Sequence, residues 1–137
     1  MTRSAQRTTS DKPANELEIL TKIEAMIAYC YTSTNQFPKA EKPGLARELR
    51  ADSWELLRLV VVCNKRYHKK TTMQKVDALH EVLRRKIKIS HVLKFLPLRK
   101  YEHWARLNDE IGKMIGGWIE SQKALEQKAV ELKKKKG

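Results

Sequence analysis

Basic side chains at helical spacing are the residues of this sequence whose types could do chemistry. Arg84, Lys88 and His91 stand at i, i+4 and i+7, with Arg85 beside the first of them. On a helix this spacing places three side chains on one face, about 5–6 Å apart. No acidic residue occurs from 82 to 101, so we expect the row to repel itself. Phosphate groups would supply the missing negative charge, and counterion release would favour their binding.

A second group of cations precedes this row. It consists of Lys65, Arg66, Lys69 and Lys70. These side chains could bind phosphate, or they could stabilise the C-terminal end of a helix through its dipole, which would explain one or two of them. Both groups lie between residues 56 and 101, where 13 basic residues face two acidic ones, and the whole chain carries +13. This excess implies a polyanionic partner, whether nucleic acid, an anionic membrane or an acidic protein, and the acid-free stretch favours RNA or DNA bound through its phosphates.

The histidines and cysteines do not form a pattern typical of a metal site. The histidines are His68, His80, His91 and His103. No two of them have the i, i+4 spacing beside a glutamate that a helical zinc site needs. His80 falls near a hydrophobic stripe and is predicted to be a buried histidine with a hydrogen-bond partner. Cys30 and Cys63 also lie in helical patterns, so we expect reduced core thiols in a cytoplasmic protein, with no metal, cofactor or small-molecule substrate.

Three glycines fall inside a helical pattern and not in a phosphate-binding loop. Gly112, Gly116 and Gly117 are predicted to be positions where another helix packs closely, because glycine has no side chain. No hydrophobic run approaches the 18 residues of a membrane-spanning helix, so no membrane partner is expected.

The residues also leave open a catalytic hypothesis, in which the protein is a ribonuclease. Arg84 or Arg85 followed by His91 resembles the arginine–histidine spacing of the HEPN ribonucleases, helical enzymes that pair the two side chains across a dimer. The polar residue that usually follows the arginine is absent, since Arg85 or Lys86 occupies that position. RNA cleavage in the presence of a chelator would support this hypothesis.

Hydrophobic residues that recur every three or four positions predict an all-α chain. The expected helices cover roughly 13–36, 45–68, 71–95 and 97–130. Thr71 or Thr72 is the expected N-cap of the third helix. Glycine and proline are too scarce for the frequent turns of a sandwich or barrel. Helices of this length with short connections predict an antiparallel up-down four-helix bundle.

The expected organisation has three parts. A flexible basic tail covers 1–12, the four-helix bundle covers 13–130, and a lysine-rich tail covers 131–137.

On the first helix the predicted inward residues are Leu17, Leu20, Ile23, Ile27, Cys30 and Tyr31. On the second they include Leu49, Leu56, Val60 and Val61. The third helix has surplus hydrophobic residues beside its inward stripe, which predict burial against another subunit or else an exposed apolar surface. They are Val82, Ile89, Val92, Leu93 and Leu96.

Several motifs in order resemble a known superfamily. The stretch from Leu98 to Glu102, followed by the stretch from Leu107 to Ile119, looks like the closing helix of the bacterial four-helix bundle superfamily. That superfamily includes proteins encoded in ribosomal RNA intervening sequences and the accessory variability determinants of diversity-generating retroelements. The ending Gly116-Gly117-Trp118-Ile119 favours the second group, and the resemblance covers about residues 16–122.

The resemblance implies more than the composition does. Accessory variability determinants are non-catalytic proteins that form pentameric barrels with basic surfaces. They bind nucleic acid and the reverse transcriptase of the element, and they support mutagenic cDNA synthesis. Arg84 and Lys88 match basic positions of the family's third helix, whereas the other cations are nominated on charge alone. An intervening-sequence-type bundle of undefined role is the alternative.

Overall fold

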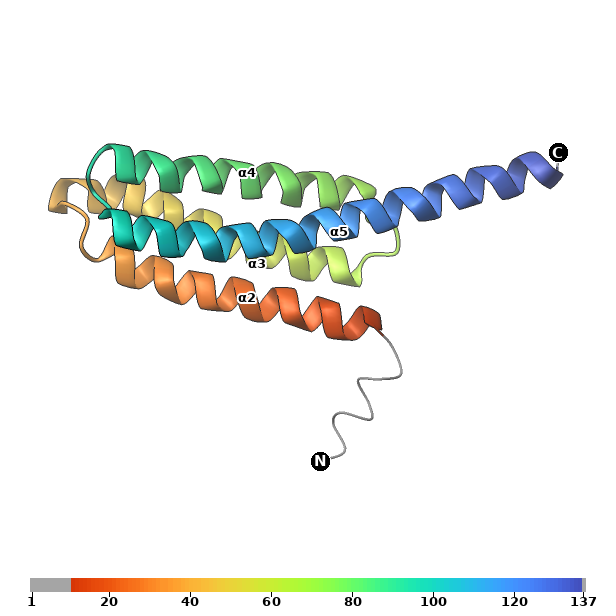
Figure 1. Cartoon of the computed structure of the whole chain (residues 1–137), viewed down its shortest axis with the longest axis horizontal. Coiled ribbons are helices and arrows are strands. Elements are labelled where there is room, and N and C mark those ends of the chain that lie inside the picture. Colours follow the sequence, from red (N-terminus) through yellow and green to blue (C-terminus); the bar gives the residue numbers. More distant parts are fainter. Residues whose placement is uncertain (1–10, 137) are drawn as a thin grey trace, which may run out of the picture.

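Four α-helices make up most of the chain in a computed structural model that describes residues 11–136 (Figure 1). They are α2 (Asp11–Thr34), α3 (Arg47–Lys65), α4 (Lys70–Val92) and α5 (Leu98–Lys136). No strand occurs within this part of the chain. The all-α prediction is therefore confirmed. The tail expected over 1–12 lies outside the described residues, apart from its last two positions, which open α2.

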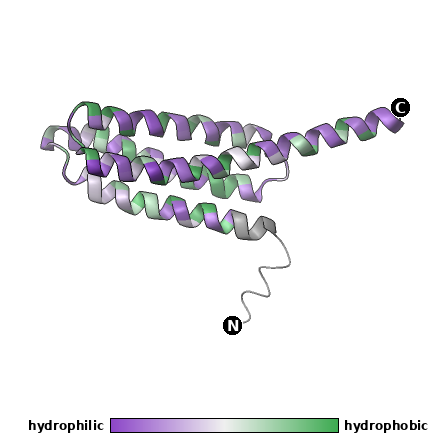
Figure 2. Ribbon diagram, in the orientation of Figure 1, coloured by the Kyte–Doolittle hydropathy of each residue, from purple (hydrophilic) through white to green (hydrophobic). Residues whose placement is uncertain are grey.

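The helices pack as a bundle in which each one contacts the two that flank it. Helix α3 lies between α2 and α4, and α5 closes the arrangement by packing on both α4 and α2 (Figure 1). Hydrophobic and hydrophilic residues alternate along every helix (Figure 2), as expected of amphipathic helices that bury one face. This is the up-and-down order that short connections favour.

The connections differ in detail from the sequence-based expectation. The proline-rich link from α2 to α3 forms two short helical turns, Lys39–Glu41 and Lys42–Ala46. Helix α4 begins at Lys70 with Lys69 as its N-cap, and no side chain caps it. The predicted threonine cap is wrong, because Thr72 lies in the first turn and is buried in the bundle.

Most predicted inward residues of the first two helices are buried, namely Ile23, Ile27, Cys30, Leu49, Leu56 and Val60, but the edges of the two buried faces differ from the prediction. Leu17, Tyr31 and Val61 were expected inside but are exposed. Ile19 and Met26, on the other flank of the α2 stripe, are fully buried instead. The core that results is dominated by large aliphatic side chains around the indole of Trp104.

His80 and Gly112 form a close contact between α4 and α5. The His80 ring is buried, and its Nε2 lies 2.7 Å from the backbone oxygen of Asn108. The prediction of a buried, hydrogen-bonded histidine is confirmed. A Cβ atom on Gly112 would lie 2.7 Å from Cε1 of His80, so this glycine is a close-packing position as predicted. For Gly116 and Gly117 that prediction is wrong within the described residues 11–136, where a Cβ at either position would meet no atom within 4 Å.

Helix α5 extends well beyond the other three. It continues past residue 130, where the bundle was expected to end, and includes the four lysines up to Lys136. All residues from 127 to 136 are exposed. Figure 1 shows this segment as a single helix that projects from one end of the bundle.

Candidate nucleic-acid interface

The surface between α4 and α5 holds the first predicted group of cations. Arg84 and Lys88 are exposed on α4 and share a face with His91, as their spacing predicts. The His91 ring stacks on Tyr101 of α5, with ring centroids 4.8 Å apart and planes within 5°. Nδ1 of His91 donates a hydrogen bond to the backbone oxygen of Leu96, at 2.9 Å. The row is therefore anchored at one end by an aromatic pair that links the two helices.

One carboxylate neutralises two of the predicted contact residues. Glu81 accepts hydrogen bonds from Nε and Nη2 of Arg84 at 3.0 and 2.7 Å, and from Nε of Arg85 at 2.8 Å. The expectation that no acid relieves the row is therefore wrong. Glu81 lies one position before the acid-free stretch and reaches forward by one helical turn, where i+3 and i+4 side chains meet.

The ion pairs of Glu81 with Arg84 and Arg85, here called the Glu81 clamp, keep the same charge state over a wide pH range. The hydrogen bonds from Arg84 and then Arg85 lower the pKa of Glu81 to about 2. A lowered carboxyl pKa stabilises the folded form above the ordinary value and loses that effect as the pH falls through the lower one. The clamp is therefore formed at neutral pH. All three side chains are exposed, and exposed ion pairs of this kind contribute little to stability because solvent screens them.

A neighbouring lysine has a structural role instead. Nζ of Lys86 lies 2.7 Å from a carboxylate oxygen of Asp52 and 3.1 Å from one of Glu48, both on α3. This half-buried lysine thus links α4 to α3 and is not free to contact a ligand. Lys88, by contrast, forms no ion pair with any residue in the described range.

The second predicted group lies at the α3–α4 turn, apart from the first. Lys69 pairs with Glu16 of α2 at 3.8 Å, and Lys70 pairs with Glu126 of α5 at 3.7 Å. Lys65 lies in the last turn of α3, where a cation also favours the helix dipole. From Lys70 to Arg84 the helix rises about 21 Å. The nominated cations therefore form two groups and not one continuous patch.

A third group of cations was not nominated from the sequence. Arg99, Lys100 and Arg106 line an open cavity of about 730 Å³ at the start of α5, together with Tyr29 and His103. Ring centroids of Tyr29 and His103 lie 4.5 Å apart. None of the three cations pairs with an acid among residues 16–136. Arg99, His103 and Arg106 have the same i, i+4, i+7 spacing as Arg84, Lys88 and His91. This spacing could have indicated the third group from the sequence.

The cysteines and the possible metal ligands in the described residues do not form a catalytic or metal site. Cys30 and Cys63 are free and buried, as predicted. Burial raises the pKa of Cys30 to about 11 and also raises that of Cys63, so both thiols are neutral at neutral pH. Within the described residues, no group of three or more acidic, histidine or cysteine side chains could hold a metal ion. Over the same residues, no helix has both the length and the apolar character needed to cross a membrane.

The fold and its charge define a class before any comparison: an all-helical bundle with basic clusters on its outer surface. A family model described as bAvd-like matches residues 17–122, and the chain belongs to this family, the accessory variability determinants of diversity-generating retroelements. The match covers parts of all four helices and ends in α5 before its projecting part. It favours the retroelement group over the intervening-sequence group. Searches of curated proteins and of solved structures gave no significant match.

Proposed function

We propose that the protein is a non-catalytic, nucleic-acid-binding subunit of a diversity-generating retroelement. In this role it associates with the element's reverse transcriptase and supports mutagenic cDNA synthesis. The observation that carries the proposal is the concentration of positive charge on α4 and the start of α5 in a chain of this family. Lys88, Arg99 and Arg106 stand exposed there without an acidic partner in the described part of the protein.

Arg84 and Lys88 are the central contacts of this proposal. The guanidinium of Arg84 already binds a carboxylate through two nitrogen atoms, a geometry that also suits a phosphate group. A phosphate that replaces Glu81 would gain Arg85 as well, since both arginines share that carboxylate. Lys88 lies one turn further along the same face. The cations at the α3–α4 turn, Lys65, Arg66, Lys69 and Lys70, would then contact a second stretch of the same strand.

Two exposed apolar surfaces support assembly into a homopentamer. One lies on α2 and α3 and contains Leu17, Tyr31, Trp54 and Val61. The other lies on α4 and the residue that follows it, and contains Val82, Ile89, Val92 and Leu93. Leu96, which was grouped with these, is instead buried in the core. Two different surfaces that cover each other between neighbours give a head-to-tail contact, and such contacts form a ring when the rotation between neighbours closes after five subunits. Light scattering after size exclusion is expected to report five subunits, and a monomer at micromolar concentration would contradict the assembly.

The nuclease alternative gains no support from the geometry. Arg84 is held by Glu81, and His91 is held by the Leu96 carbonyl and the Tyr101 ring. Both side chains are thus engaged with other groups of the same chain.

Salt-dependent RNA binding tests the proposal. Labelled single-stranded RNA is expected to bind tightly in dilute buffer, because phosphate contacts release counterions. With four such contacts per strand, raising the salt from about 50 to 200 mM should weaken binding by about 50-fold, with little dependence on sequence. Fluorescence anisotropy across a salt series, repeated with DNA of the same sequence, gives the measurement. Failure to bind either polymer at the lowest salt would refute nucleic-acid binding.

A further inference from the structure

The core-facing residues of α5 follow a heptad repeat that does not stop where the bundle stops. Inside the bundle the repeat consists of the buried residues Trp104, Asn108, Ile111 and Ile115. The alternating spacing of four and three residues then continues through Trp118, Gln122, Leu125, Ala129 and Leu132, here called the α5 seam. Such spacing is typical of a helix that packs against another helix along its whole length.

The outer part of the α5 seam has nothing to pack against within the described chain. Trp118 and Gln122 are half-buried, but the side chains of Leu125 and Leu132 are 53% and 60% exposed. Figure 2 shows the projecting end of α5 as mostly purple with a few isolated green segments. From Gln122 to Lys136 the helix is about 21 Å long. This segment also lies beyond the family match, which ends at residue 122.

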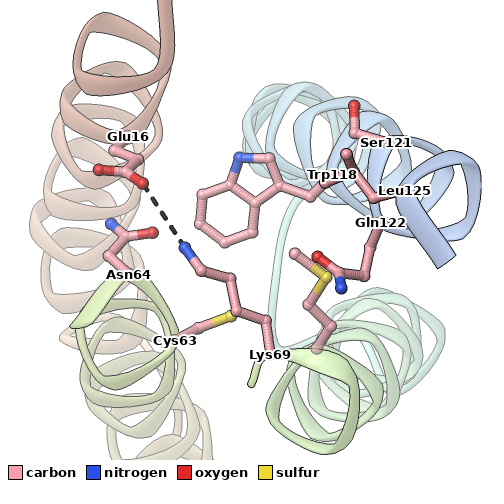
Figure 3. Close-up of a pocket in the computed structure, with 9 residues that line it drawn as sticks. Glu16, Cys63, Asn64, Lys69, Trp118, Ser121, Gln122 and Leu125 are labelled. Carbon is pink, nitrogen blue, oxygen red and sulfur yellow. Dashed lines mark ion pairs between the residues drawn. The ribbon is translucent and has the colours of Figure 1, made fainter. Parts of the chain in front are cut away.

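A pocket at the base of the α5 seam extends this apolar surface into the end of the bundle. Trp118 and Leu125 line it together with Met73 of α4 and Cys63 of α3, and its volume is about 140 Å³. Figure 3 shows the Trp118 indole directed into this space, with the Glu16–Lys69 ion pair opposite. The rest of the lining is polar and consists of Glu16, Asn64, Lys69, Ser121 and Gln122. The volume is enough for one large side chain that has an apolar body and a polar end.

The charges beside the α5 seam indicate what kind of helix would cover it. Lys128, Lys133 and Lys135 occupy the flanking positions of the heptad, which lie next to the partner helix. The one flanking acid, Glu126, already pairs with Lys70 of α4. A second copy of α5 would therefore place lysines opposite lysines in either orientation. A partner with glutamate or aspartate at these positions would form favourable pairs.

We propose that the α5 seam binds an acidic amphipathic helix of another protein. The leucines and the alanine of the seam bury the apolar stripe of that helix, and the three flanking lysines pair with its acidic residues. One bulky side chain near the end of the partner helix enters the pocket beside Trp118. This surface is separate from the Arg84–Lys88 row, and the proposal does not depend on nucleic-acid binding.

The test uses the full chain and a labelled three-heptad peptide that has leucine at its core positions and glutamate at its flanking positions. Wild-type protein should bind this peptide and should not bind the same peptide with lysine in place of glutamate. Replacing Leu125 and Leu132 by serine is expected to weaken binding at least about tenfold, since two apolar contacts are lost. The matched control is Val130→Ser, which removes an equally exposed apolar residue from outside the seam and should leave the affinity unchanged.

Three results would overturn the proposal. The first is equal peptide affinity in the wild type and in the L125S/L132S variant. The second is a smaller oligomer for that variant in sedimentation velocity, which would show that a second copy covers the seam. The third is a loss of RNA affinity in the same variant, which would assign the surface to nucleic acid. Unchanged helical circular dichroism excludes misfolding as the cause of any of these differences.

Discussion

Replacing Arg84 and Lys88 together by glutamate is expected to weaken RNA binding by about 100-fold or more. The two changes remove two phosphate contacts and add two negative charges beside Glu81, so the site changes from attracting to repelling the strand. Both residues are exposed, and neither contributes to the core, so the fold should be retained. Anisotropy of labelled single-stranded RNA at fixed salt measures the loss, and circular dichroism measures helix content.

Two further variants separate a local site from net charge. Lys39→Glu combined with Lys75→Glu makes the same change in charge at exposed positions outside the candidate site, and it should weaken binding far less. If both double variants lose affinity equally, the row on α4 is not the contact surface. Glu81→Gln should act in the opposite direction and raise the affinity severalfold, because a neutral amide competes less with phosphate for Arg84 and Arg85.

Gly112→Ala is expected to destabilise the protein by about 2 kcal/mol, although alanine is the better helix former. The new Cβ would lie 2.7 Å from Cε1 of the buried His80 ring. Moving the ring away breaks its hydrogen bond to the Asn108 carbonyl, and overpacking adds to the cost. Together these effects exceed the gain of about 1 kcal/mol from helix propensity. Urea denaturation at fixed protein concentration measures the free energy of unfolding.

The neighbouring glycine supplies the matched control for that measurement. Gly116→Ala meets no atom within 4 Å, so it should stabilise the helix by about 0.5–1 kcal/mol. In a His80→Ala background the clash is gone, and Gly112→Ala should then become neutral or stabilising. A destabilising Gly112→Ala in that background would show that the His80 contact is not the cause.

The sequence by itself determined the features that depend on local spacing. Helix number and approximate helix ends follow from hydrophobic periodicity and from the prolines that interrupt it. The basic character of α4 and the family resemblance over about 16–122 also come directly from the residues, and the family match over 17–122 agrees with them. The Glu81 clamp was within reach of the sequence as well, because Arg84 and Arg85 stand three and four residues after Glu81; the prediction of a self-repelling row considered only the acid-free stretch 82–101.

Tertiary structure decided the features that depend on how the helices are rotated against one another. Lys86 meets Glu48 and Asp52 only because α3 packs on α4, and this removes it from the binding surface. Tyr29 of α2 lines the same cavity as the cations of α5. The two segments are far apart in the sequence, so no local pattern could predict that they meet. Gly112 and Gly116 are equivalent in sequence terms, yet only Gly112 faces a buried ring. A small rotation of a helix about its axis changes which flank of its apolar stripe is buried, and only the packing of its neighbours fixes that rotation.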